Sequence, residues 1–211
     1  MFMPTQRFLN LPKDKREKIE YTAIREFSEK PLFEVSINQI IKKADISRGS
    51  FYTYFKDKED LLQYLLQDFR QKCRNWVIQN LEINNGDLFR AARNAMTELM
   101  DHGKEQRNFE FYKNILLNSK IFANISLIGF EDFVYQDENY HQFVSNCYCK
   151  LNKNLCPIEN VPKLACLMEV LILLVLKSTA LYFMGSAEKE DILKILDCQL
   201  QILNQGVQKI N

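Results

Sequence analysis

The stretch SINQIIKKADISRGSFYTYFKDKEDLL, residues 36–62, decides the fold of this chain. It begins with Ser36-Ile-Asn-Gln39, which has the form of a capping box and predicts a short helix. A tight turn at Asp45-Ile46 ends that helix, and Ser47 can cap a second short helix. Two short helices joined by a turn of a few residues form a helix-turn-helix, whose second helix can enter the major groove of DNA.

Helices are also predicted on both sides of this pair. Ile19, Ala23 and Phe27 recur at four-residue spacing and predict a bracing helix over residues 13–29. Pro31 ends it, because proline disfavours a helical conformation in the residue before it. After the pair, Asp57 can cap a long helix whose apolar side includes Leu61, Leu62, Leu65, Leu66, Phe69, Cys73 and Trp76.

Each part of the central stretch has its own physical role. Phe51 and Phe55, four residues apart, are expected to anchor the second helix to the core, and small Ala44 lets the two helices approach. Gly49 leaves the backbone of the second helix open to close approach by DNA. Residues 36–58 contain five basic and two acidic side chains, a local charge of +3 in a chain whose net charge is only +1. The charge that would attract DNA is therefore local and modest.

The stretch resembles the N-terminal domain of the TetR family of bacterial transcriptional repressors. Thirteen positions agree with the family pattern in order and spacing: Ser36, Ile40, Ala44, Ile46, Ser47, Gly49, Phe51, Tyr52, Tyr54, Phe55, Lys58, Glu59 and Leu61. Ile41, Asp45 and Asp57 depart from it, and Asp45 replaces the turn glycine. Aspartate tolerates the left-handed conformation better than most residues, so we expect the turn to persist. The match covers about residues 13–66.

The resemblance implies which side chains meet DNA. Base edges would be contacted by Arg48, Gly49, Tyr52 and Thr53, together with Asn38, which could instead contact phosphate. Phosphates would be contacted by Ser36, Ser50, Tyr54, Lys56 and Lys58. The alternative is that both tyrosines only cover the small core and that Arg48 and Lys58 are solvated surface charges.

The rest of the chain is predicted to be helical as well. Asn84-Asn85-Gly86 is a break, and helices are expected near residues 87–102, 106–118, 135–152, 163–184 and 188–208. The sequence therefore predicts an all-α fold in which a helix-turn-helix domain precedes a larger helical domain. We place the first domain at residues 1–56, with the motif at about 36–55 and a flexible arm at 1–12. The second domain covers 57–211.

The larger domain is expected to dimerise and to bind a ligand, both by resemblance to the family. The helices at about 163–184 and 188–208 are strongly apolar and could form a two-fold homodimer, although burial within one subunit is the alternative. Aromatic residues gather between 109 and 148, as is typical of ligand pockets, although an aromatic cluster at helical spacing is more often part of the core. Candidate pocket residues are Trp76, Phe111, Tyr112, Phe130, Phe133 and Glu169. Glu169, inside an apolar helix, would either pair with a basic side chain or face the pocket.

The sequence offers little to other classes of function. The six scattered glycines form no nucleotide-binding loop, and neither histidine lies in a zinc-protease motif, so we expect no enzyme and no cofactor. The six cysteines match no paired zinc spacing, and we expect no metal. The N-terminus lacks a signal peptide and the longest apolar run has seven residues, which predicts a cytoplasmic protein.

Two functions remain open at this stage. The first is a repressor that binds a palindromic operator as a dimer and is released by a small apolar or aromatic molecule. The second is a DNA-tethering protein whose C-terminal half binds another protein.

Overall fold

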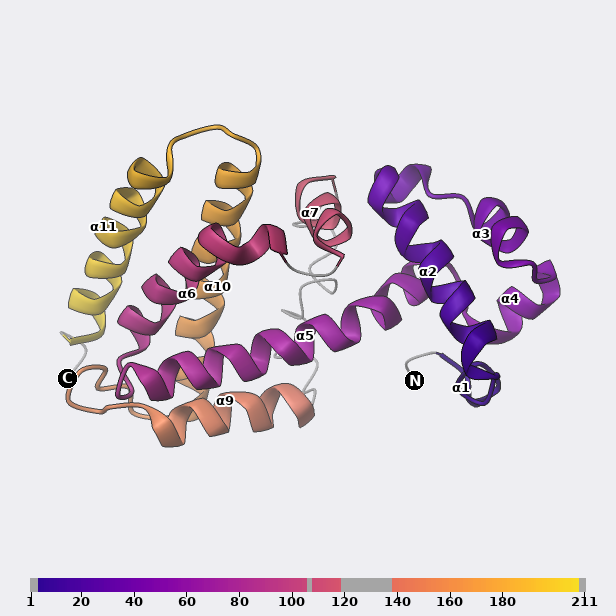
Figure 1. Ribbon diagram of the computed structural model, residues 1–211. Helices are drawn as coiled ribbons and strands as arrows, with labels where there is room; N and C mark the ends of the chain where they lie inside the picture. Colours follow the sequence, from indigo (N-terminus) through magenta and orange to yellow (C-terminus); the bar gives the residue numbers. More distant parts are fainter. Residues whose placement is uncertain (1–3, 106–107, 119–137, 209–211) are drawn as a thin grey trace. The chain divides into compact units, whose positions relative to one another are not determined.

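The computed structural model describes residues 4–105, 108–118 and 138–208, and the regular elements there are all helices (Figure 1). The all-α prediction is confirmed. By its contacts the chain divides into two compact units, Met1–Gln71 with Arg107–Leu127, and Lys72–Gln106 with Ile128–Asn211.

The first unit contains the predicted helix-turn-helix. Its helices are α1 (Gln6–Leu9), α2 (Lys13–Glu29), the 3-10 turn η1 (Leu32–Glu34), α3 (Ile37–Ala44), α4 (Arg48–Tyr54), the first half of α5 (Lys58–Ile83) and α7 (Phe109–Asn118). The bounds of α2 agree with the prediction at both ends. Phe51 and Phe55 are fully buried beside Ile40 and Ala44, so α4 is anchored to the core as the spacing predicts.

Local capping explains where these helices begin and end. The Ser47 hydroxyl accepts a hydrogen bond from the Ser50 amide at 3.0 Å, and the Asp57 carboxylate accepts one from the Asp60 amide at 2.8 Å. Asp45 adopts the left-handed conformation, with φ 58°, that the turn requires. One expectation is wrong. Ser36 precedes α3, but its side chain makes no capping hydrogen bond with that helix.

The N-terminal segment also differs from the flexible arm that we expected over residues 1–12. Residues 6–9 form the helical turn α1, and Phe8 is fully buried against the aromatic rings of Phe55 and Tyr64. Periodicity gives no sign of this contact, because a helical turn of four residues is too short to carry a helical pattern.

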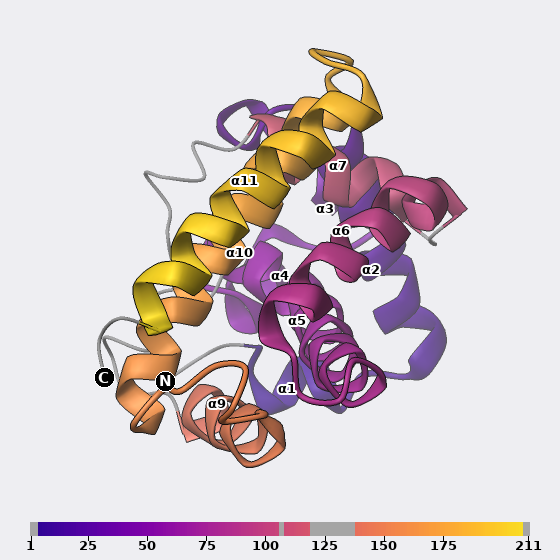
Figure 2. The same cartoon turned by 90° about the vertical axis from the view of Figure 1, so that its left-hand side faces the viewer.

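The second unit is a bundle formed by the later part of α5, α6 (Leu88–His102), the 3-10 turn η2 (Gly103–Glu105), α9 (Glu138–Lys150), α10 (Val161–Phe183) and α11 (Lys189–Gln208). Figures 1 and 2 show α10 and α11 side by side, and α6 packs against both. Gly86 adopts φ 77° at the predicted break. A Cβ there would lie 2.5 Å from the backbone of residues 150 and 152, so this turn requires glycine.

The helix α10 begins two residues before its predicted start, because Pro162 is tolerated in the first turn of a helix. The Asn160 side chain caps it by accepting a hydrogen bond from the Lys163 amide at 3.0 Å. By length and composition alone, α10 could cross a membrane, as the core helices of many soluble proteins could. Here it packs against α6, α9 and α11 as the central helix of the unit.

Candidate nucleic-acid interface

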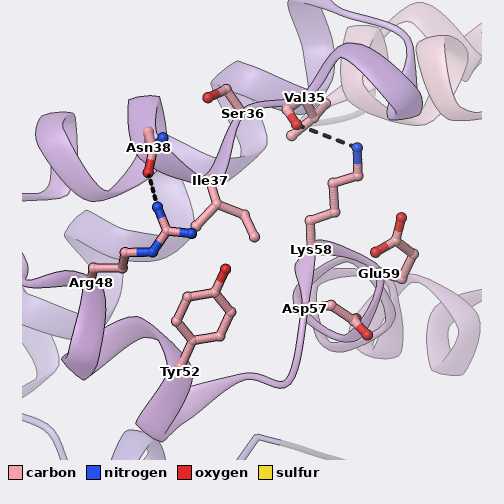
Figure 3. A pocket seen from close by; sticks show the side chains of 9 residues that line it. All are labelled: Val35, Ser36, Ile37, Asn38, Arg48, Tyr52, Asp57, Lys58 and Glu59. Carbon is pink, nitrogen blue, oxygen red and sulfur yellow. Dashed lines mark hydrogen bonds between the residues drawn. The ribbon is translucent and has the colours of Figure 1, made fainter.

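Side chains from α3 and α4 meet on one exposed surface of the first unit (Figure 3). Arg48 Nη1 donates a hydrogen bond to Asn38 Oδ1 at 3.0 Å. The guanidinium carbon of Arg48 also lies 5.6 Å from the centre of the Tyr52 ring, a cation–π distance. Tyr52 is 44% exposed, so a large part of this residue does not cover the core. Three predicted base-contacting residues therefore form one polar cluster.

A cavity of about 310 Å³ opens beside this cluster, between the N-terminal ends of α3 and α5. Figure 3 shows the Tyr52 ring between Arg48 and Lys58, with its hydroxyl directed toward Ile37. Lys58 Nζ donates hydrogen bonds to the carbonyls of Phe33 at 3.2 Å and Val35 at 3.4 Å. These bonds hold the positive charge of Lys58 beside the segment that leads into α3. The N-terminal end of α3 also carries a positive partial charge, so both features favour an anion at this place.

The surface around Gly49 is open. A Cβ built on Gly49 would have only one neighbour within 4 Å, the Ser47 hydroxyl at 3.9 Å. Glycine is unfavourable inside a helix by about 0.5–1 kcal/mol relative to alanine. Within the described part of the chain, no close packing against Gly49 explains why this position is a glycine and not an alanine.

The other residues that are predicted to contact DNA differ in their exposure and in their hydrogen bonds. Lys56 is exposed. The Thr53 hydroxyl donates to the Gly49 carbonyl at 2.8 Å, and the Ser50 and Ser47 hydroxyls are 2.8 Å apart. Tyr54 is only 8% exposed, with its ring packed against Phe8. Only a small part of Tyr54 is therefore accessible to a DNA phosphate.

Sequence reasoning missed a buried carboxylate that joins α2 to the motif. Glu26 is fully buried, and its two oxygens accept hydrogen bonds from Lys30 Nζ at 2.6 Å and Lys43 Nζ at 3.3 Å. Burial raises the pKa of this carboxyl, but the two lysines outweigh that effect and hold the pKa below its usual value. Its position was a usable signal, because residue 26 shares the apolar face of Ile19 and Ala23.

The described ligand-pocket candidates are divided between the two units. Phe111 and Tyr112 belong to the first unit, where Phe111 is buried against Phe27 and Tyr112 stacks on Phe69 at 4.1 Å. In the second unit, Trp76 Nε1 donates to Glu98 Oε2 at 2.9 Å.

The remaining pocket candidates are Glu169, Phe130 and Phe133. Burial raises the pKa of Glu169, which is half-buried on α10. Phe130 and Phe133 lie outside the described residues.

Two family models match the chain. The model described as bacterial regulatory proteins, tetR family, matches residues 21–65, and the model described as tetracyclin repressor-like, C-terminal domain, matches residues 87–207. Together they include α3, α4 and most of the second unit.

Individual proteins are similar as well. An HTH-type transcriptional regulator of Staphylococcus aureus strain USA300 is 40% identical over 143 residues, 62% of this chain and 74% of the relative. Another from Bacillus subtilis is 27% identical over 108 residues, and the match spans 55% of that relative. A crystal structure of a TetR family transcriptional regulator from Chloroflexus aurantiacus aligns with 97% of this chain at 21% identity, with a TM-score of 0.47.

Proposed function

Because the chain belongs to the TetR family of bacterial transcriptional regulators, we propose that it is a cytoplasmic repressor that binds a palindromic operator as a homodimer. The family assignment makes it a DNA-binding regulator rather than a member of an enzyme family. In this proposal residues 1–56 read DNA, and residues 57–211 dimerise and respond to a small apolar or aromatic molecule.

The open surface over Gly49 is the observation that carries the DNA-binding part. Gly49 is in the first turn of α4, next to Arg48, and one turn before Tyr52. The N-terminal residues of a recognition helix lie closest to the bases, where a bare backbone permits close approach. A DNA surface against Gly49 would explain why glycine is kept at a position where the protein itself leaves room for a methyl group.

Gly49→Ala is therefore expected to change folding and binding in opposite directions. The free energy of unfolding should rise by about 0.5–1 kcal/mol, because alanine favours the helix. Affinity for the operator should fall at least about tenfold, because the methyl group holds the two surfaces apart. Thermal unfolding and fluorescence anisotropy with a labelled duplex measure the two effects. A variant that gained stability and kept its operator affinity would contradict the assignment of this surface.

Arg48 and Lys58 are expected to contribute differently. Arg48→Ala should cost about 1–3 kcal/mol on the operator and much less on random DNA, because a side chain that reads a base matters only at the preferred sequence. Lys58→Gln keeps a donor for the Phe33 and Val35 carbonyls while removing the charge. It should weaken binding to both duplexes alike and lower the slope of log affinity against log salt by about 1.

The control for both variants is Arg25→Ala. Arg25 is an exposed arginine on α2 that forms an ion pair with Glu29 one helical turn away, and it is remote in sequence from the motif. Its removal changes the net charge by the same amount as the other two. Equal losses for all three variants on both duplexes would mean that net charge alone governs binding and that no division of roles exists.

Exposed apolar residues on α10 and α11 support the dimer. On α10 they recur at three- and four-residue spacing at Cys166, Val170 and Leu173, and on α11 they do so at Ile195, Cys198 and Ile202. The two helices pack side by side, and each carries one stripe of exposed apolar residues. Large exposed apolar surfaces commonly mark interfaces. A dimer must also set its two recognition helices about 34 Å apart to meet successive major grooves.

Two residues of the second unit support release by a ligand. Glu169 is half-buried, and no cationic side chain in the described ranges offsets the burial that raises its pKa. A cationic or hydrogen-bonding ligand would stabilise that carboxylate. Trp76 is half-buried on α5, the helix that begins at the DNA-binding motif and continues into the second unit.

A panel of small apolar and aromatic compounds is expected to contain one that changes Trp76 fluorescence and lowers operator affinity together. Trp76 is the sole tryptophan of the chain, so the signal has one source. A coupling free energy of about 1–3 kcal/mol would change operator affinity roughly 5- to 150-fold. If no compound from a chemically broad panel changed both signals, DNA tethering through a protein partner would become the better proposal.

A further inference from the structure

We propose that the N-terminal turn is a positioning element of the DNA-reading surface, in which Thr5 holds the C-terminal end of the recognition helix α4. The proposal rests on the DNA-binding function above and adds a segment that precedes the matched family region, residues 21–65. It assigns a role in sequence recognition to residues that need not touch a base.

The contact consists of two hydrogen bonds to consecutive carbonyls. Thr5 Oγ1 donates to the Thr53 carbonyl at 2.9 Å, and the Thr5 amide donates to the Tyr54 carbonyl at 3.2 Å. The last four carbonyls of a helix have no amide partner within that helix. In a helix as short as α4, from Arg48 to Tyr54, these carbonyls are a large part of the backbone, so an external donor restrains much of the helix.

Phe8 and Leu9 fasten the turn that carries Thr5. The Phe8 ring is fully buried, 4.7 Å from the Phe55 ring centre and 5.2 Å from that of Tyr64. Arg16 Nη1 on α2 donates to the Leu9 carbonyl at 3.0 Å. The turn that carries the Thr5 donor is thus fixed by two contacts: Phe8 packs in the aromatic core, and the Leu9 carbonyl is hydrogen-bonded to α2.

The recognition helix is consequently restrained at both ends. At its start, the Ser47 hydroxyl accepts from the Ser50 amide, and Arg48 is bonded to Asn38. At its end, the Phe55 amide donates to the Phe51 carbonyl, and Thr5 supplies the donors to the carbonyls of Thr53 and Tyr54. Reading base edges requires side chains to be held to within about 0.5 Å of the productive geometry. Without the Thr5 contact, the last turn of α4 could fray, and Tyr52 and Thr53 would lose their fixed orientation.

Thr5→Val and Thr5→Ser test this role. Valine keeps the size and branching of threonine but removes the hydroxyl donor, whereas serine keeps the donor. The probe is the duplex that the wild-type protein enriches from a random DNA library, compared with a random duplex. Thr5→Val should weaken binding to the enriched duplex about fivefold, the equivalent of one hydrogen bond, and leave the random duplex unchanged. Thr5→Ser should restore wild-type affinity.

Hydrogen exchange of the protein without DNA gives a second, independent measurement. The amides of residues 52–55 should exchange faster in Thr5→Val than in the wild type or Thr5→Ser, while those of α2 stay unchanged. Unchanged exchange in α4, or equal weakening on both duplexes, would overturn the proposal. If the wild-type protein enriched no duplex, the DNA-binding function would fail, and hydrogen exchange would still decide whether Thr5 holds the end of α4.

Discussion

Val170→Asp is expected to convert the protein into a monomer and to reduce its affinity for operator DNA by about 100-fold or more. Val170 is 41% exposed in the middle of the apolar stripe on α10. In the proposed dimer interface, an aspartate at this position would be a buried charge without a partner, which costs far more free energy than one apolar side chain contributes. Binding one half-site at a time forfeits the avidity of the linked pair, typically 10²- to 10⁴-fold.

Leu155→Asp is the matched control for this prediction. Leu155 is also 41% exposed, but it lies in the loop before α10, outside both stripes. Both variants introduce the same charge into the same unit at equal exposure. Sedimentation velocity at micromolar concentration measures the assembly, and anisotropy with the operator duplex measures binding. The interface would have to be sought elsewhere if Val170→Asp remained a dimer, or if both variants dissociated equally.

Phe111→Ala is expected to lower the free energy of unfolding of the DNA-binding unit by about 3–5 kcal/mol, the usual cost of emptying a buried phenylalanine site. The Phe111 ring is 1% exposed and lies 6.2 Å from the Phe27 ring of α2, centre to centre. From the same helix α7, Asn114 Nδ2 donates to the carbonyls of Phe27 at 2.6 Å and Lys30 at 2.7 Å. These bonds satisfy carbonyls at the C-terminal end of α2, which would otherwise lack partners.

Phe109→Ala provides the comparison, because Phe109 is on α7 too but is only half-buried. Its replacement should cost less than half as much. Urea unfolding followed by circular dichroism gives both values. The measurement also separates two roles for Phe111. A residue that mainly lined a ligand pocket would alter ligand affinity and leave the stability of the empty protein nearly unchanged.

The position of α7 affects how regulation could operate. The helix lies within the sequence matched by the C-terminal family model, residues 87–207, yet it packs against α2 in the unit that contains the helix-turn-helix. A ligand that displaced α7 would therefore disturb the helix that braces the motif directly.

The sequence alone determined the helix-turn-helix and most helix boundaries. Those features depend on residues close together in the chain, namely the caps at Ser47 and Asp57, the left-handed turn at Asp45 and the four-residue spacing of Phe51 and Phe55. The energies that fix such elements act between near neighbours, so the pattern is visible in the order of residues. The side chains that we propose to face DNA were assigned by the resemblance to the TetR family.

Only the tertiary structure decided the contacts between distant segments. Phe8 in the aromatic core, Thr5 at the end of α4, the link from Glu26 to Lys43, and Phe111 against α2 all join positions whose spacing in the sequence carries no periodic signal. A buried phenylalanine suits a pocket wall and a helix interface equally well by its chemistry. Which of these it forms depends on the surface that packing brings against it, and that surface is set by the whole fold rather than by neighbouring residues.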